Sequence, residues 1–442
     1  MRSITEPAKA VNIVDEVDVC VLGGGCTGTF AAVRAARLGA RVAIVEKHNC
    51  FGGVGTSGAV GIWHSLKDSE DREQIIAGLT LELIEKLGKR DAVDGLRINT
   101  EELKIELDEL VTESGVNPYL HSFYSAPYIK DGSLDAVIIE NKDGRNAIRA
   151  KIFIDATGDG DLCRDLGIPC DESRPLQPPS LCSKIYGLHT SEGFDWEKAF
   201  NEHCVEYGLK KDMGWCHGIP GIPEITLHAA THIFDVDCSV SSQLTYSEIM
   251  ARKGVRVLMD IIRKHGPENG RIHLVQLAST IGIRETRHVR CLYTLTEKDV
   301  LHGRKFEDGI ANGAYPVDHN TIDPTKGYIL RYLNGIEKIH SFEDHSVEIR
   351  RWREETENNP TYYQIPYRSL VPGKFPNLLV CGRALDADKG AFGAVRVMTI
   401  LNQTGEAAGT AAYLALAGEK PVTEIETGKL KKVLKEGGSI IL

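Results

Sequence analysis

The chain has 442 residues, with 52 Lys and Arg against 62 Asp and Glu, for a formal net charge of −10. At roughly 150 residues per domain, this length predicts two to three domains. The acidic balance excludes a general nucleic-acid or acidic-membrane binder, which requires a basic surface. The best candidate for a membrane span, residues 29–45, is interrupted by arginines and falls short of the roughly 18–20 uninterrupted apolar residues required. We therefore expect neither nucleic acid nor a membrane among the partners.

The 11 cysteines are scattered, without a C-x-x-C pair or the cysteine run of an iron–sulfur cluster. In a chain of this size they indicate reduced thiols, so a cytoplasmic protein without a metal centre is expected. The N-terminal segment carries Arg2, Glu6 and Lys9 and no apolar core, and no secretory signal is expected.

The most informative pattern begins at residues 17–22, a short apolar run that predicts a buried parallel strand. Residues 23–28 follow with the spacing G-x-G-x-x-G, and an alanine-rich helix is expected over residues 29–38. A second strand is expected over residues 41–45, ending at Glu46. This order of strand, glycine turn, helix, strand and acid favours a dinucleotide-binding unit over a purely structural glycine turn.

Each residue type in this unit suits a bound dinucleotide. Gly23 permits a tight turn, Gly25 lets backbone N–H groups approach a pyrophosphate, and Gly28 lets the helix pack closely on the strand. The positive end of the helix dipole favours phosphate. Glu46 would accept hydrogen bonds from ribose hydroxyls and disfavour a 2′-phosphate, which excludes NADP but does not separate NAD from FAD. The candidate contacts are Gly23, Gly25, Cys26, Thr27, Gly28, Glu46 and Lys47.

A second glycine loop, residues 51–58, comes shortly after this acid. We interpret it as a wrap around the ribityl-phosphate segment of an extended cofactor, with a flexible surface loop as the alternative. The candidate contacts in the loop are Gly53, Thr56 and Ser57.

An amphipathic helix is expected over residues 99–114, followed by strand-like segments at 119–129, 134–140 and 147–154. Asp-Gly turns separate these segments, which predicts a three-strand antiparallel insertion. The last strand runs into residues 155–161, where a parallel strand would meet the cofactor crevice. The candidate contacts there are Ala156, Thr157, Gly158 and Asp159.

The composition changes after about residue 170, where prolines, histidines, tryptophans and cysteines become frequent. We expect a substrate domain over residues 172–360, with a strand over 224–236 and a helix over 247–265.

Two groups of residues in this domain have a functional and a structural interpretation. His228 and His232 lie four apart, but their β-branched neighbours favour a strand over a helical metal pair; one of them could line a substrate pocket. The basic run 282–288 could bind an anion or orient substrate, or it could form internal ion pairs through Glu285.

A second strand–turn–helix unit lies near the end of the chain, with a strand expected over residues 376–380 and a small-residue helix over 399–416. Its helix N-terminus suits an extended cofactor that contacts two helix N-termini, one at its pyrophosphate and one at its flavin. The second N-terminus can stabilise the negative charge that a reduced flavin develops. The pattern therefore favours FAD over NAD. The candidate contacts are Gly382, Arg383, Gly393, Arg396, Val397 and Met398.

Together these motifs resemble the FAD-dependent oxidoreductases of the glutathione-reductase-type fold, akin to the flavin subunit of heterodisulfide reductase and distantly to succinate/fumarate flavoproteins. The resemblance covers nearly the whole chain, in segments 4–9, 23–28, 46, 52–58, 156–161, 282–288, 365–370, 382–383, 393–398 and 405–412. It implies FAD held at its ADP half by the first glycine unit, residues 157–159 near the pyrophosphate and ribityl chain, and backbone N–H groups of residues 396–398 at the flavin O2. The chain departs from its relatives at Cys26, Lys389, Thr399 and Glu406, where they often carry Pro, a nearby His, Pro and Gln.

The expected fold is α/β, with a Rossmann-like FAD/NAD(P)-binding doubly wound domain, its three-strand antiparallel insertion, and an α+β substrate domain. The FAD-binding domain would combine residues 12–171 and 361–420, flanking the substrate domain at 172–360. Residues 421–442 would form a C-terminal helix and tail.

The expected function is dehydrogenase-type hydride transfer between a small polar organic substrate and flavin N5, with FAD carrying the chemistry. The alternatives are an NAD(P)H-dependent flavin monooxygenase and a non-catalytic FAD electron-relay subunit of a larger complex. Besides the substrate, an unidentified electron acceptor is expected, and a homo-oligomer is left open. The candidates for proton transfer or substrate anchoring are His64, Arg284, Arg287 and His288.

Overall fold

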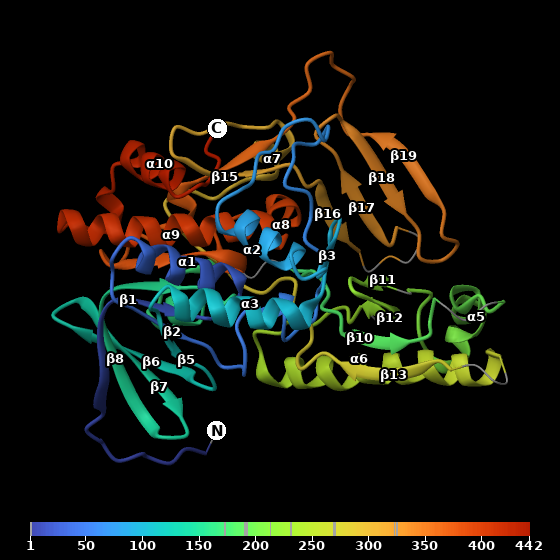
Figure 1. Ribbon diagram of the computed structural model, residues 1–442, viewed down its shortest axis with the longest axis horizontal. Helices are drawn as coiled ribbons and strands as arrows, with labels where there is room; N and C mark the ends of the chain where they lie inside the picture. The colour runs from blue at the N-terminus through green and yellow to red at the C-terminus, as the bar shows by residue number, and fades with distance from the viewer. Residues whose placement is uncertain are drawn as a thin grey trace.

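The computed structural model describes residues 2–171, 174–189, 193–212, 214–229, 232–267, 271–321, 323 and 326–442. A mainly parallel sheet covered by helices forms one part of the molecule, and two antiparallel sheets form the other (Figure 1). This arrangement confirms the α/β, Rossmann-like fold class expected from the sequence.

The large sheet has the strand order β5-β2-β1-β8-β7-β6, and β21 also pairs with β8. Strands β5, β2, β1, β8 and β21 run parallel, whereas β6 and β7 are antiparallel additions beside β8. The strands are β1 (Asn12–Leu22), β2 (Val42–Val45), β5 (Asn117–Tyr119), β6 (Phe123–Lys130), β7 (Ser133–Asn141), β8 (Gly144–Asp155) and β21 (Leu378–Val380).

The expected three-strand meander is present as β6, β7 and β8, but it is not separate from the parallel sheet. The first half of β8 pairs with β7, while residues 146–155 of the strand also pair with β1. The third strand of the meander is therefore a central strand of the nucleotide-binding sheet, which carries the chain directly from the meander to the carboxyl edge.

Alternating side chains of the sheet face two cores, as the period of a β-strand requires. Val19 and Val21 of β1 lie in the core formed with helices α1, α2, α3 and α9. Cys20 and Leu22 lie in the opposite core, which includes residues of β7 and α4. The helices are α1 (Cys26–Arg37), α2 (Leu79–Gly88), α3 (Thr100–Glu113), α4 (Asp161–Asp165) and α9 (Met398–Gly418).

Helices α1 and α9 come from opposite ends of the chain and lie side by side (Figure 1). A Cβ atom on Gly405 would lie 2.1 Å from the carbonyl oxygen of Thr27, and one on Gly409 would lie 2.1 Å from that of Ala31. The expectation of a small-residue helix over residues 399–416 therefore has a packing reason, because only glycine permits this helix spacing.

The second part of the molecule contains two four-stranded antiparallel sheets with the orders β11-β12-β10-β13 and β16-β17-β18-β19. Helices α5 (Trp196–His203) and α6 (Ser241–His265) share an apolar core with the first of these sheets. The strands are β10 (Cys182–Tyr186), β11 (Trp215–Ile219), β12 (Ile222–Ala229), β13 (His273–Leu277), β16 (Val317–Asn320), β17 (Tyr328–Arg331), β18 (Ile336–His340) and β19 (Val347–Arg351).

Two predicted elements of this part differ from the structure. The strand expected over residues 224–236 ends at Ala229; residues 230–231 lie outside the described residues, and residues 232–236 form no strand. The helix expected to begin at residue 247 begins at Ser241.

The apolar core and a small two-stranded sheet run across the proposed domain boundaries. Leu295 and Val300 share the core of α1 and α9, and β15 (Gly309–Gly313) pairs with β20 (Tyr363–Pro366) across the proposed boundary at residue 360. The expected C-terminal helix is α10 (Thr427–Glu436). No helix in the described part of the chain is long and apolar enough to cross a membrane.

Candidate cofactor and substrate site

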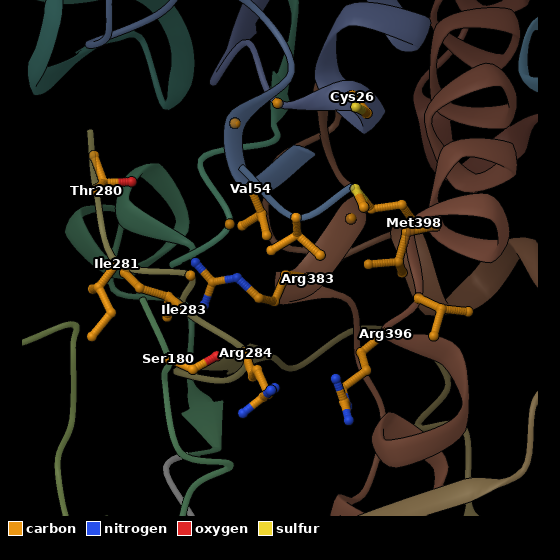
Figure 2. A pocket seen from close by; sticks show the side chains of 18 of the residues that line it. Cys26, Val54, Ser180, Thr280, Ile281, Ile283, Arg284, Arg383, Arg396 and Met398 are labelled. Atoms are coloured by element: carbon orange, nitrogen blue, oxygen red, sulfur yellow. The ribbon is translucent and has the colours of Figure 1, made fainter. Parts of the chain in front are cut away.

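A cavity of about 500 Å³ opens at the carboxyl ends of β1, β2 and β8 (Figure 2). One end is lined by the glycine turn after β1 and the loop after β8. The other end is lined by residues of β11, β16 and β17. The cavity thus joins the nucleotide-binding sheet to both antiparallel sheets.

The three motif glycines occupy three different environments. Gly23 has φ +96°, and a Cβ there would lie 2.2 Å from the carbonyl oxygen of Ala156. A Cβ on Gly28 would lie 1.9 Å from the carbonyl oxygen of Gly23, whereas a Cβ on Gly25 would meet no atom within 4 Å. Gly23 and Gly28 therefore permit close backbone packing, and Gly25 keeps the space in front of α1 open.

The N-terminus of α1 faces this open space. Gly25 is its N-cap residue, no side chain caps the helix, and no acidic residue lies in its first turn. The first backbone N–H groups of a helix lack internal acceptors and carry its partial positive charge. This end of the cavity can therefore hold a diphosphate.

Glu46 closes the same end of the cavity. Its carboxylate accepts hydrogen bonds from the backbone N–H of Gly24 at 2.7 Å and from that of His48 at 2.8 Å. Because each carboxylate oxygen has further lone pairs, Glu46 can also accept hydrogen bonds from ribose hydroxyls.

The loop after β8 is fixed by two buried aspartates. Asp155 accepts hydrogen bonds from the Thr157 hydroxyl at 2.7 Å and from the backbone N–H of Cys163 at 2.9 Å. Asp159 pairs with Arg383 at 2.7 Å. Burial alone would raise the pKa of Asp159, but the charges of Arg383 and Lys47 and the hydrogen bonds from Thr286 and Arg383 together lower that pKa. The loop is therefore tied to the segment after β21.

Helix α9 presents a second uncapped N-terminus, with Val397 as the N-cap residue and Met398 as the first helical residue. Both residues line the cavity. This geometry suits the negative pyrimidine end of a reduced flavin, as the resemblance implies.

Most of the residues predicted to bind the cofactor line this one cavity. They are Gly23, Gly25, Cys26, Thr27, Glu46, Lys47, Gly53, Ala156, Thr157, Gly158, Asp159, Gly382, Arg383, Arg396, Val397 and Met398.

Four predicted contacts do not line the cavity. Gly28 packs on the β1 turn, and a Cβ on Gly393 would lie 2.6 Å from the carbonyl oxygen of Asp318, so both glycines serve packing. Thr56 donates a hydrogen bond to the carbonyl oxygen of Phe51, and the Ser57 hydroxyl lies 3.4 Å from the thiol of Cys50. These two hydroxyl groups therefore form contacts within the region of the second glycine loop and do not line the cavity.

An acidic residue after β2 and two uncapped helix N-termini border one cavity, which is the arrangement expected of a flavin-dinucleotide-binding oxidoreductase of the Rossmann-like type. The family model described as FAD dependent oxidoreductase matches residues 18–434, and the chain belongs to this family. Its cofactor is FAD.

Curated relatives include the thiamine thiazole synthase of Methanococcus aeolicus, 29% identical over 169 residues, which are 36% of this chain and 59% of that protein. The mitochondrial dihydrolipoyl dehydrogenase of Schizosaccharomyces pombe is 32% identical over 161 residues, which are 32% of this chain and 28% of that protein. The chain thus matches less than two thirds of each relative. A solved geranylgeranyl bacteriochlorophyll reductase-like protein from Thermoplasma acidophilum aligns with 96% of this chain and 84% of its own, at a TM-score of 0.49 and 12% identity.

A cluster of charged and aromatic side chains lies at the end of the cavity away from the glycine turn. Arg396 pairs with Asp318 at 2.6 Å, and the Tyr315 hydroxyl donates to the same carboxylate at 3.1 Å. The ring centroid of His64 lies 4.3 Å from that of Tyr315. Burial, and then the charge of Arg396, lower the pKa of His64 to about 4, so this imidazole is neutral at pH 7.

A second histidine lines the same end of the cavity. His232 lies with Nδ1 2.7 Å from the carboxylate of Asp212, which also accepts from the backbone N–H of His232 at 3.0 Å. Burial lowers the pKa of His232 in spite of Asp212. Burial disfavours the charge of Asp212, but the partner imidazole and backbone N–H groups hold its pKa at about 2.

Arg284, a predicted site residue, also lines this end, and Figure 2 shows it with Arg396 far from Cys26. It donates one hydrogen bond, from Nη1 to the carbonyl oxygen of Pro178 at 2.7 Å. Burial, followed by the charge of Arg396, lowers the pKa of Arg284 to about 10.

The other two predicted catalytic residues, Arg287 and His288, do not line the cavity. Arg287 is buried against Asp161, whose carboxylate lies 3.3 Å away, and His288 lies 3.0 Å from the carboxylate of Glu285. His288 therefore has the contact with Glu285 that the alternative of internal pairing expects, whereas Arg287 pairs with Asp161 instead.

The two histidines considered as a metal pair have separate environments. His228 lies on β12, as the neighbouring residues indicated, and its ring packs edge-on against Trp196. His232 lies beyond the end of that strand and pairs with Asp212. The described residues contain no group of three His, Cys, Asp or Glu side chains that could hold a metal ion.

Several residues at this end of the cavity were not predicted from the sequence. Asp212 lies in the loop before β11, Tyr315 in the loop before β16, and Asp318 within β16, and no sequence spacing marks them. His232 was considered only as one of two pocket candidates. The further lining residues that were missed are Trp215, Asn320, Tyr328 and Phe342.

Proposed function

We propose that the protein dehydrogenates a small polar organic substrate by hydride transfer between a substrate carbon and N5 of FAD. One observation carries this proposal: an aspartate-paired histidine and two arginines border the same end of the cofactor cavity. A polar substrate held there would have a proton acceptor beside it, which a subunit that only relays electrons does not need.

FAD, when bound, supplies the two-electron acceptor. For an alcohol substrate, the C–H bond breaks and its electron pair leaves with the hydrogen as hydride. The O–H proton passes to a base on the protein, and the carbon–oxygen double bond forms. The protein must therefore provide a neutral base and hold the hydroxyl beside it.

His232 fits this role better than His64. Because Nδ1 of His232 faces Asp212, the proton of the neutral ring is held there and Nε2 keeps its lone pair. When Nε2 gains a proton, the adjacent carboxylate stabilises the resulting charge. Arg396 lowers the pKa of His64, and no carboxylate in the described part of the chain is hydrogen-bonded to this imidazole, so it would gain a proton less readily.

The remaining lining residues suit substrate positioning. Asp318 holds both Arg396 and Tyr315, which fixes their orientation at the cavity. Trp215, Tyr328 and Phe342 add aromatic surface that excludes water from a bound substrate.

The proposal is tested by anaerobic bleaching of the purified yellow protein with a panel of alcohols, amines and hydroxy acids. At least one class is expected to bleach the flavin stoichiometrically and to yield the oxidised product. The variant His232→Gln should keep its FAD and bleach far more slowly.

Two other results would contradict the proposal. Rapid bleaching by NADPH, with oxygen-dependent hydroxylation of an added substrate, would identify the monooxygenase alternative. A flavin that no member of the panel reduces, but that exchanges electrons with a co-purifying protein, would identify the electron-relay alternative.

A further inference from the structure

Three arginines line the cavity, and their partners differ. Arg383 pairs with Asp159 at 2.7 Å, and Arg396 pairs with Asp318 at 2.6 Å. Arg284 forms no ion pair with any residue in the described part of the chain; its hydrogen bond goes to the Pro178 carbonyl oxygen. A guanidinium has five N–H donors, so most of the donors of Arg284 remain available toward the cavity.

The carboxylates of this region are already engaged elsewhere. Asp212 accepts hydrogen bonds from His232 and from the backbone N–H of Gly214. Asp318 accepts from Arg396 and Tyr315. Neither carboxylate lies within ion-pair distance of Arg284, although both are among its electrostatic neighbours.

The surroundings of Arg284 disfavour an unpaired charge. Arg284 is half-buried, and a cation shielded from water is destabilised unless an opposite charge pairs with it. Arg396 adds a repulsive contribution, since its positive charge and burial together depress the pKa of Arg284. An anion entering the cavity would remove this imbalance without displacing any existing ion pair.

We propose that Arg284 binds a carboxylate of the substrate, so that the protein acts on organic acids. This inference rests on the proposed dehydrogenase function and specifies its substrate class. Arginine binds carboxylate through two parallel hydrogen bonds, which would fix the acid in one orientation. Figure 2 shows Arg284 at the end of the cavity opposite Cys26 at the N-terminus of α1, so the site for this carboxylate is separate from the diphosphate site.

The test measures equilibrium binding to the FAD-loaded protein without turnover. Malonate is titrated by calorimetry and by the flavin difference spectrum, and malonamide serves as a neutral probe of similar size. The wild type is expected to bind malonate at least tenfold more tightly than malonamide. Arg284→Gln should lose that preference, and Arg284→Lys should keep part of it.

Arg263→Gln provides the matched control, because it removes the same charge from an exposed pair with Asp260 on α6. It should bind malonate as the wild type does. Equal binding of malonate and malonamide to the wild type, or unchanged malonate binding by Arg284→Gln, overturns the inference. Loss of FAD from Arg284→Gln also overturns it, because Arg284 would then hold the cofactor.

These outcomes are separable from failure of the proposed function. Charge-selective binding that depends on Arg284, in a protein whose flavin no organic substrate reduces, would retain the anion site and reject dehydrogenation. Flavin reduced equally well by neutral and acidic substrates, in both wild type and Arg284→Gln, would retain dehydrogenation and reject the anion site.

Discussion

Of the two histidines at the proposed substrate end of the cavity, His232 has a carboxylate in direct contact and His64 has none among the described residues. His232 contacts the carboxylate of Asp212, and its further electrostatic neighbours are Arg284 and Asp318. His64 packs on the Tyr315 ring, and Arg396 lowers its pKa further after burial. An imidazole that must gain a proton during reaction is favoured by a carboxylate and disfavoured by a guanidinium. We therefore expect His232, and not His64, to act as the base.

We predict that His232→Gln slows anaerobic bleaching by about 10²- to 10⁴-fold, the usual contribution of a general base. His64→Gln should slow it by less than about tenfold, because a neutral residue at this position still packs on Tyr315. Stopped-flow spectroscopy measures both rate constants at saturating substrate. Equal losses in the two variants would contradict the assignment of the base.

The pH dependence of bleaching gives a second prediction for the same residue. Only neutral His232 can accept a proton, so the rate constant should rise with pH and level off above the pKa. Burial lowers this pKa from 6.5, and therefore the rise should be centred below pH 6.5. Asp212→Asn removes the carboxylate that favours the imidazolium, so the rise should move to still lower pH and the plateau should fall. A profile that did not move in Asp212→Asn would exclude the pair as the titrating unit.

At the scale of elements, the glycine turn combines two requirements that can be separated by substitution. A side chain at position 28 would clash with the turn after β1, because a Cβ there would lie 1.9 Å from the Gly23 carbonyl oxygen. Gly25 has no atom within 4 Å of its Cβ position, and its φ of −59° is open to any residue. Backbone packing thus restricts the residue at position 28, whereas no atom of the described chain restricts the residue at position 25.

We predict that Gly25→Val yields a folded but colourless protein, with FAD affinity reduced by at least 100-fold, because the valine side chain occupies the diphosphate space. Gly28→Val should lower the melting temperature even in the absence of FAD. Gly88→Ala, at the end of α2 and with open space at its Cβ position, is the control and should change neither property. Fluorescence of released FAD and thermal unfolding measure the two effects. Normal FAD content in Gly25→Val would contradict the placement of the cofactor.

The sequence predicted elements well where local order determines them. Residues 17–46 contain a buried run, a glycine turn, a helix and a terminal acid in uninterrupted order, and the structure has β1, α1 and β2 there. The small antiparallel sheets were harder to predict. Asp318 lies on β16 and Asp212 precedes β11, in different sheets, and no local pattern indicates that both reach one cavity. His288 is the opposite case. Its place in a basic run predicts a ligand contact, but in the structure its side chain contacts the carboxylate of Glu285.

At the scale of the whole molecule, one buried ion pair links segments from both ends of the chain. Arg34 on α1 pairs with Glu406 on α9, and both side chains are almost fully buried. Arg34 also donates to the carbonyl oxygen of Gly437 at 2.8 Å, and Glu406 accepts from the backbone N–H of Leu79 at 3.1 Å. The buried carboxylate of Glu406 is thus matched by a cationic partner.

This pair should stabilise the relative position of the two helices whose N-termini face the cofactor. Removing one member of a buried ion pair leaves the other charge without compensation and costs about 3–5 kcal/mol, whereas replacing both by apolar residues is often nearly neutral. We therefore predict that Arg34→Met and Glu406→Leu each lower the melting temperature strongly, and that the double variant is more stable than either single variant.

Added FAD should raise the melting temperature of all three variants, because only the folded state binds FAD. Thermal unfolding at several FAD concentrations measures both effects. Arg37→Met is the control, because Arg37 lies on the same helix as Arg34 but forms a partly exposed ion pair with Glu82 of α2. Strictly additive losses in the double variant would show that Arg34 and Glu406 act independently and that their ion pair does not hold the two helices together.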